Sequence, residues 1–280
     1  MAPSKTPSTK LATKKKSPAP APPPEPPRPP SIEERTAALE ARLNQADPTF
    51  QKQYRDSLDM SWIAHDAALE GTVYTVQELQ TAMDPQSSFV GDSSLQPICE
   101  EIRRHREALD FVRETAQKRK LPVTLDTLKR LYTILHPEEG DIKTVKYRKD
   151  IPQHRLYFHE YTPPDKIPAK VRQAIDWVND PETRKTRNPI RIASRVHYDL
   201  LRVFPFQTDS GKVARLFMNL LLLRSGYPPA IIHSAERQRY YEALKGSPTT
   251  MTQIVQEAID NSLASIEKLL ELEERRVAPR

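Results

Sequence analysis

The chain has little cysteine, little glycine and no long apolar run, and each shortage excludes a class of protein. Cys99 is the single cysteine among 280 residues, so no disulfide can form within the chain, and a reducing, cytoplasmic compartment is expected. Six glycines are too few for the turns and bulges of a protein built from several β-sheets. The longest apolar stretch, residues 216–223, falls well short of the roughly 18 residues that span a membrane.

Excess charge and proline are concentrated at the N-terminus. The net charge is +6, and residues 1–31 account for +5 of it and for 11 of the 27 prolines. Leu11 is the only large apolar residue there after Met1, so this segment cannot bury enough surface to offset the entropy of ordering it. We predict a disordered, basic, proline-rich tail over residues 1–30, with a stiff polyproline-like spacer at Pro18–Pro30.

The lysines of this tail leave several interpretations open. Lys14, Lys15 and Lys16 are consecutive and can attract nucleic acid or another anionic surface. The segment can equally contact a protein partner or serve as a solvated linker. A targeting role is opposed by its prolines, which disfavour the amphipathic helix of a transit peptide.

Beyond residue 30 the pattern is helical. Ser31 and Glu34 form the sequence of a capping box, which predicts a helix start, and Gly71 is a favourable residue just past a helix end. Apolar residues at helical spacing predict helices at residues 31–47, 49–70, 75–83, 98–121, 125–135, 169–179, 190–203, 211–224, 235–245 and 250–274. Residues 142–168 break the period and read as a small β-hairpin or loop. The predicted class is mainly α with one small β element.

Residues 204–215, FPFQTDSGKVAR, lie between two predicted helices. They resemble the signature of the Fic family, H-P-F-x-[D/E]-G-N-G-R-x-x-R, in altered form. Lys146-Tyr147-Arg148 resembles the family's G-x-Y-R element, and His197 stands where the family has a histidine on the helix that enters the motif. The resemblance covers roughly residues 95–250 and implies a Fic-type helical bundle with a β-hairpin flap. It suggests an N-terminal helical region at 31–94, a Fic-like core at 95–250 and a C-terminal helix and tail at 251–280.

The resemblance also implies an activity, the transfer of AMP from ATP to a protein hydroxyl with the help of Mg²⁺. Phe204 occupies the position of the catalytic histidine, and a phenylalanine cannot act as a general base. Thr208 replaces the metal-binding carboxylate, and a hydroxyl alone is a weak magnesium ligand. Asp209 replaces the first glycine of the phosphate-binding turn and brings negative charge there. Asp209 could instead take over the metal role from one position along, so Thr208 and Asp209 remain the metal candidates.

The other motif positions are better kept. Ser210 replaces asparagine and Lys212 replaces arginine, which keeps the charge but loses the planar fork. Gly211 and Arg215 match the signature. The resemblance therefore gives five candidates for binding nucleotide or phosphate: Asp209, Ser210, Gly211, Lys212 and Arg215. None of His197, His154 and His159 restores the missing base by its spacing.

A second element resembles the family's inhibitory helix, [S/T]-x-x-x-E-[G/N]. Glu70 and Gly71 match this pattern, whereas Asp66 stands where Ser or Thr is expected. The resemblance implies that Glu70 pairs with Arg215 and blocks the γ-phosphate of ATP. It also places Leu156, Tyr157 and Phe158 in the flap that orders target peptides.

Base, metal ligand and phosphate turn are altered together, so we expect a Fic-fold pseudoenzyme that acts as a protein-binding or regulatory module. Its partner would bind through the flap, by addition of an extended strand, or through the tail. Mg²⁺ and ATP are expected only if the site survives. The alternative is a divergent nucleotidyl- or phosphotransferase that Glu70 holds inactive. A nucleic-acid-associated protein is a third hypothesis, resting on Lys14, Lys15 and Lys16 alone.

Overall fold

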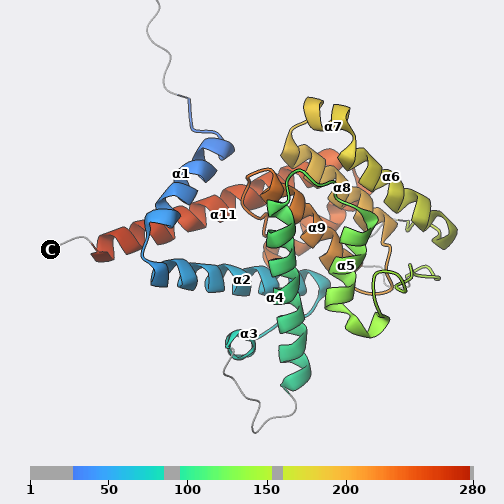
Figure 1. Ribbon diagram of the computed structural model, residues 1–280, viewed down its shortest axis with the longest axis horizontal. Helices are drawn as coiled ribbons and strands as arrows, with labels where there is room; N and C mark the ends of the chain where they lie inside the picture. The colour runs from blue at the N-terminus through green and yellow to red at the C-terminus, as the bar shows by residue number, and fades with distance from the viewer. Residues whose placement is uncertain (1–27, 85–94, 153–159, 278–280) are drawn as a thin grey trace, which may run out of the picture. The chain divides into compact units, whose positions relative to one another are not determined.

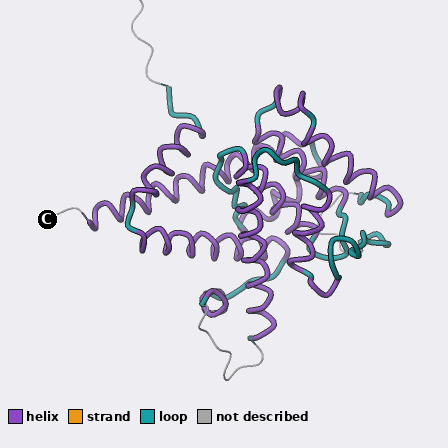
Figure 2. Tube along the Cα trace, viewed as in Figure 1, coloured by secondary structure: helices purple, strands orange, loops and turns teal. Residues whose placement is uncertain are grey.

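The computed structural model describes residues 28–84, 95–152 and 160–277. The chain divides after Pro30, and the described residues from Ser31 onward form one compact unit. Helices dominate the described part, which contains no β-strand (Figure 2). The predicted mainly α class is therefore confirmed.

Most neighbouring helices are joined by short connections, whereas residues 136–166 separate α5 from α6 (Figure 1). The α-helices are α1 Ile32–Gln45, α2 Pro48–Glu70, α3 Val76–Met83, α4 Gln96–Gln117, α5 Leu125–Leu135, α6 Ile167–Asn179, α7 Pro181–Thr186, α8 Pro189–Val203, α9 Ser210–Arg224, α10 Arg237–Glu242 and α11 Pro248–Val277. Short 3₁₀ helices lie at η1 Pro137–Glu139, η2 Pro164–Lys166, η3 Ser234–Glu236 and η4 Ala243–Lys245. The predicted helix at 235–245 is thus helical but changes type twice.

Local sequence signals set several helix ends. The Glu34 N–H donates to Ser31 Oγ at 3.2 Å, and the Ser31 N–H donates to Glu34 Oε2 at 2.7 Å, which confirms the predicted capping box at the start of α1. Gly71 ends α2 with φ at 101°, a left-handed conformation that glycine adopts without strain.

The helix α9, which begins within the motif at Ser210, lies at the centre of the core. Its residues are buried from Ser210 to Leu222, and it packs against α2, α4, α5 and α8. A helix with apolar residues all round is expected to be enclosed by others. Its N-terminus therefore starts at the meeting point of several elements, and this position places the motif.

The helices α6 and α11 pack on α8, so α8 separates α9 from that side of the fold. The helix α1 packs on α11. That contact includes ion pairs from Arg35 to Asp260 at 2.8 Å and to Glu267 at 3.2 Å. Exposed pairs of this kind contribute little to stability individually.

The predicted flap lies mainly at residues 153–159, outside the described residues. Residues 141–152 and 160–163 on either side form turns, bends and irregular backbone. Their backbone groups pair with the motif region: the Arg148 N–H donates to Pro205 O at 3.0 Å, and the Thr162 N–H donates to Arg202 O at 3.3 Å. The proline-rich tail at residues 1–27 also lies outside the described part. The divisions at residues 95 and 250 stay predictions.

Candidate functional site

The motif loop joins α8 to α9 and contains two unusual backbone conformations. Phe204 has φ at 48° and Asp209 has φ at 47°, and they are the non-glycine residues with positive φ in the described part of the chain. Side chains disfavour this region, although aspartate tolerates it better than most. The loop thus keeps at Asp209 a conformation natural to glycine, the residue that the signature has there.

The Phe204 side chain is buried in the hydrophobic core. Only 3% of its surface is exposed, and its ring meets that of Tyr161 edge-on, with centroids 5.3 Å apart. The side chain is apolar and cannot exchange a proton. The position that the resemblance assigns to the general base therefore holds part of the hydrophobic core.

Arg148 holds the loop in place by hydrogen bonds, whereas in the sequence it stood out only as part of the G-x-Y-R-like element. Its guanidinium is buried and donates to four backbone carbonyls: Phe204 O at 2.6 Å, Val203 O at 3.0 Å, Asp150 O at 2.8 Å and Thr162 O at 2.5 Å. Burial lowers the pKa of this guanidinium. Arg148 thus ties the chain on both sides of residues 153–159 to the start of the motif.

Ser210 and Gly211 begin α9 and are both buried. The Ser210 hydroxyl accepts from the Phe206 N–H at 2.7 Å and donates to Phe206 O at 3.0 Å. Ser210 therefore closes the loop on itself. Nothing in these contacts directs its hydroxyl towards a ligand.

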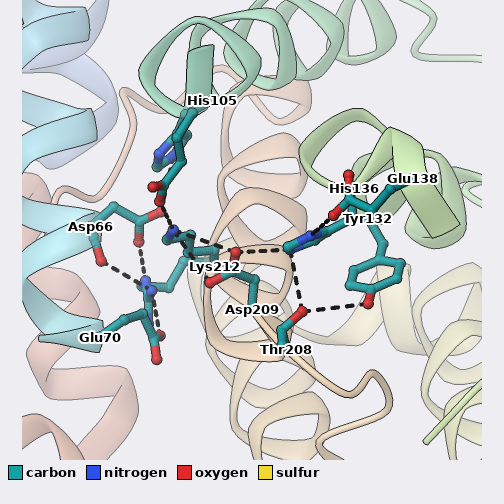
Figure 3. A network of polar contacts seen from close by, with 11 residues as sticks. Asp66, Glu70, His105, Tyr132, His136, Glu138, Thr208, Asp209 and Lys212 are labelled. Carbon is teal, nitrogen blue, oxygen red and sulfur yellow. Dashed lines mark hydrogen bonds and ion pairs between the residues drawn. The ribbon is translucent and has the colours of Figure 1, made fainter. Parts of the chain in front are cut away.

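Asp209 is held by His136 and Lys212 (Figure 3). Its Oδ2 lies 2.9 Å from His136 Nε2, and its Oδ1 lies 3.3 Å from Lys212 Nζ. Burial acts to raise the pKa of Asp209, but His136 and Lys212 outweigh it and lower that pKa to about 2. On its other side, His136 Nδ1 lies 2.9 Å from Glu138 Oε1. Burial acts to lower the pKa of His136, and the two carboxylates outweigh it and raise that pKa.

Thr208 belongs to the same cluster. Its hydroxyl lies 3.3 Å from His136 Nε2 and 3.5 Å from the Tyr132 hydroxyl. A magnesium site takes one or two carboxylates together with phosphate oxygens and waters. Here the single loop carboxylate, Asp209, is already bonded to a lysine and a histidine, and Thr208 adds no charge. The residues present do not fit Mg²⁺.

Lys212 is buried with 4% of its surface exposed. Besides Asp209, its ammonium donates to Glu101 Oε1 from α4 at 3.0 Å. Burial acts to lower the pKa of Lys212, while Asp209 and Glu101 raise it above its ordinary value. Two carboxylates thus neutralise this cation.

Arg215 is bonded to two carboxylates of α2. Its Nη2 donates to Glu70 Oε1 at 2.7 Å, which is the ion pair that the resemblance implies. Its Nε donates to Asp66 Oδ1 as well. Burial opposes the charge of Arg215, but Asp66 and Glu70 raise its pKa well above the ordinary value. An inhibitory role for Glu70 and Gly71 remains a prediction.

Asp66 is the second carboxylate bonded to Arg215. In the sequence it stood out only as a mismatch to the inhibitory-helix pattern. It is buried, with 3% of its surface exposed, and its Oδ2 lies 3.1 Å from His105 Nε2 of α4. Burial acts to raise the pKa of Asp66, and Arg215 and His105 outweigh it and lower that pKa. Asp66 and Glu70 are four residues apart and so share one face of α2.

The end of α2 is fixed from the other side by α10. Leu69 O accepts from Arg237 Nε at 2.8 Å and from the Tyr241 hydroxyl at 2.6 Å. This places Glu70 against α9 immediately before the chain turns at Gly71.

His197 does not take the place of the missing base. It is fully buried on α8, and its Nε2 lies 2.9 Å from the Tyr240 hydroxyl. Burial and the charge of Arg215 lower its pKa to about 3. His197 is therefore neutral and belongs to the packing around Arg215, because Tyr240 also accepts from Arg215 Nη1 at 3.3 Å.

The remaining candidates, Leu156, Tyr157, Phe158, His154, His159 and the lysines at 14–16, lie outside the described residues. The structure adds Asp66, Glu101, His105 and His136, which sequence reasoning missed. A carboxylate one turn before Glu70 is the only signal that the sequence offered for any of them. The others come from α4 or from the end of α5 and meet the motif only through the fold.

Comparison with known families and proteins finds similarity to Fic proteins. Residues 122–222 match the Fic/DOC family. The Drosophila willistoni protein named protein adenylyltransferase Fic is 26% identical over 224 residues, 77% of this chain and 42% of that protein. Its counterpart from Nematostella vectensis is 28% identical over 186 residues, 65% of this chain and 42% of that protein. The matched part of this chain thus spans less than half the length of these curated relatives.

Solved structures of similar fold cover most of the chain. A Fic domain containing signaling protein from Bacteroides thetaiotaomicron matches 87% of this chain and 96% of its own, with a TM-score of 0.65 and 23% identity. Fic-1 from Caenorhabditis elegans matches 85% of this chain and 71% of its own, with a TM-score of 0.65 and 20% identity. At these low identities, the two likenesses show the fold alone.

Proposed function

This chain contains a Fic/DOC-family domain at residues 122–222, and we propose that it has lost ordinary AMP transfer and acts as a protein-binding or regulatory module. One observation carries the proposal. Lys212 and Arg215, the cations that the resemblance assigns to phosphate, are both buried, and each is bonded to two carboxylates.

An ATP molecule would have to displace these internal partners. Two cations face four carboxylates, from Asp66, Glu70, Glu101 and Asp209. A triphosphate brought to such a site meets like charge in a poorly solvated place, where electrostatic interactions are only weakly screened. The backbone amides at the start of α9 do not compensate, because the N-cap residue of that helix, Asp209, itself carries a carboxylate.

The loop also lacks the catalytic groups that AMP transfer needs. General-base assistance is typically worth about 10²–10⁴ in rate, and Phe204 cannot supply it. The residues at positions 208 and 209 do not fit the metal. Nucleotide transfer through this loop would need a base and a metal ligand from elsewhere.

What the chain keeps is a scaffold suited to contacts with a protein. Arg148 fixes the two ends of residues 153–159 against the motif, and the relatives' name, protein adenylyltransferase, implies that they act on proteins. The module therefore recognises a protein partner. Among the described residues, no helix combines the length and apolarity needed to cross a membrane.

The alternative is a divergent nucleotidyl- or phosphotransferase that modifies protein hydroxyls. The relatives' name and the Glu70–Arg215 ion pair favour it, since an inhibitory contact is needed only where there is something to inhibit. In that case Asp209 and Lys212 would do the chemistry.

Transfer of radiolabel from α- or γ-labelled ATP separates the two functions. Glu70→Gly alone leaves Arg215 bonded to Asp66, so the assay needs the double variant Asp66→Ser/Glu70→Gly as well. We expect no covalent label on this chain or on added protein in either variant, and no Mg-ATP binding by calorimetry at micromolar concentrations. Label that appears in the double variant and disappears when Arg215→Ala is added would overturn the proposal and establish the transferase.

A further inference from the structure

A second charged site lies outside the motif. A groove between α6, α8 and α11 encloses about 990 Å³. Its lining includes Thr162, Arg202 and Val203, and Val203 immediately precedes Phe204 in the chain. The groove therefore reaches the motif loop and follows α8, against which α6 and α11 pack (Figure 1).

The floor of the groove is a row of arginines. Arg191, Arg195 and Arg202 line it from α8, and their spacing of four and seven residues places them on one helical face. Arg187 extends the row beyond the helix start, and Lys170 adds a cation from α6. From Arg191 to Arg202 the row covers about 16 Å at the rise of an α-helix.

Arg202 donates to the Tyr198 hydroxyl at 3.1 Å and to Leu244 O at 3.0 Å, but Arg187 and Arg191 remain available to a ligand, in contrast to the cations of the motif. Arg187 and Arg191 are exposed and form no ion pair with any carboxylate of the described residues. The Arg187 guanidinium instead rests on the Trp177 ring, 5.7 Å from its centroid. Among the described residues, Asp199 is the one acidic side chain that lines the groove, and it is bonded to Arg195 at 2.8 Å.

The rest of the lining is polar and uncharged. It includes Gln173 from α6 and Thr252, Gln253 and Gln256 from α11. Amides and hydroxyls both donate and accept hydrogen bonds, whereas the Asp199 carboxylate only accepts. A ligand that fits this lining presents negative charges to the arginines together with hydrogen-bond donors.

An acidic peptide has both properties. Its carboxylates suit arginine, which binds them in a bidentate manner, and its backbone N–H groups can donate to Asp199 and to the glutamine oxygens. The phosphodiester backbone of single-stranded DNA carries charge but no donor. At about 3.3 Å per residue, five or six extended residues match the length of the arginine row.

We propose that this groove binds an acidic, extended segment of a partner protein. The inference rests on the proposed protein-binding function and gives the chemistry of its partner.

Fluorescence anisotropy of the full chain tests this. The probe is a fluorescein-labelled peptide of six Glu-Ser repeats, and its match is the same peptide with Gln in place of Glu. We expect the acidic peptide to bind, the neutral one not to, and Arg187→Gln/Arg191→Gln to weaken binding by about tenfold. Both arginines are exposed, so these changes spare the core. Arg55→Gln, an exposed arginine of α2, is the matched control and leaves binding unchanged.

Two further arms test the rival explanations. Lys14→Gln/Lys15→Gln/Lys16→Gln reports on the tail, and loss of binding there but not in the groove variant would overturn the assignment. A fluorescein-labelled dT12 that binds more tightly than the acidic peptide, with the same sensitivity to Arg187 and Arg191, would replace the peptide by single-stranded nucleic acid. Absence of binding by either probe overturns the groove proposal alone, because the ATP-labelling assay reports on the motif separately.

Discussion

Asp209 combines a glycine-like backbone with a side chain that bonds to two neighbours. It holds a left-handed conformation of the kind that glycine adopts without strain, with φ at 47°. Its carboxylate then binds His136 and Lys212 and removes both from any ligand. The interaction with His136 depends on pH, because a neutral imidazole loses one of the two protons that face Asp209 and Glu138.

We predict that His136 stabilises the fold in acid and neutral solution and does so less in base. Its pKa is raised above the ordinary 6.5, so its contribution is complete below about pH 6.5 and is lost as the pH rises through the folded-state pKa. The free energy of unfolding in urea should differ between the wild type and His136→Gln by about 1–2 kcal/mol at pH 6. That difference should shrink by pH 9. A difference that is the same at both values would contradict the assignment.

At this scale the sequence allowed some partners to be predicted and not others. The ion pair from Glu70 to Arg215 followed from the resemblance because both residues occupy family positions. Asp66 occupies one too, but with an unexpected residue type, and only the geometry gives it a partner. His136 and Glu101 lie far from the motif in sequence, and no local pattern distinguishes them from surface residues.

At the scale of elements, α2 is held on α9 by its two carboxylates. Asp66 and Arg215 are both 3% exposed, and removal of one member of a buried pair leaves an uncompensated charge. Glu70 is more accessible, with 15% of its side chain exposed. The two carboxylates should therefore contribute unequally to stability.

We predict that Asp66→Ala lowers the free energy of unfolding by about 3–5 kcal/mol, and Glu70→Ala by about 1 kcal/mol. Chemical denaturation followed by circular dichroism measures both. The double variant Asp66→Leu/Arg215→Met, which removes both charges and refills the space, should recover most of the loss. Equal effects of the two single variants would show that Asp66 is not the main anchor.

Helix ends with a chemical signal, such as the capping box at Ser31 and the glycine at 71, were predictable because a local interaction determines them. For residues 142–168 the sequence left a hairpin and a loop open, and the described flanks of residues 153–159 are irregular backbone. Their backbone groups pair with Arg148, Pro205 and Arg202, and such tertiary contacts have no local signal in the sequence. The breaks within residues 234–245 had no local signal either.

Across the whole molecule, positive charge is divided between two sites with opposite availability. The motif cations are enclosed and neutralised by carboxylates of α2, α4 and the loop itself. Among the described residues that line the α6–α8–α11 groove, the cations other than the half-buried Arg202 are exposed, and Asp199 is the one carboxylate. This distribution agrees with the proposed function, in which the chain recognises a protein and does not bind nucleotide at the motif.

Restoration of the motif tests the proposal that the altered loop does not transfer AMP. We predict that Phe204→His, Thr208→Asp, Asp209→Gly, Ser210→Asn and Lys212→Arg, combined with Asp66→Ser and Glu70→Gly, produce covalent labelling from α-labelled ATP. These changes supply a base, a carboxylate and an open turn, and they free Arg215. The same set without Phe204→His should be about 10²–10⁴ slower. A restored protein that melts like the wild type and stays unlabelled would show that these seven replacements are not enough for AMP transfer on this scaffold.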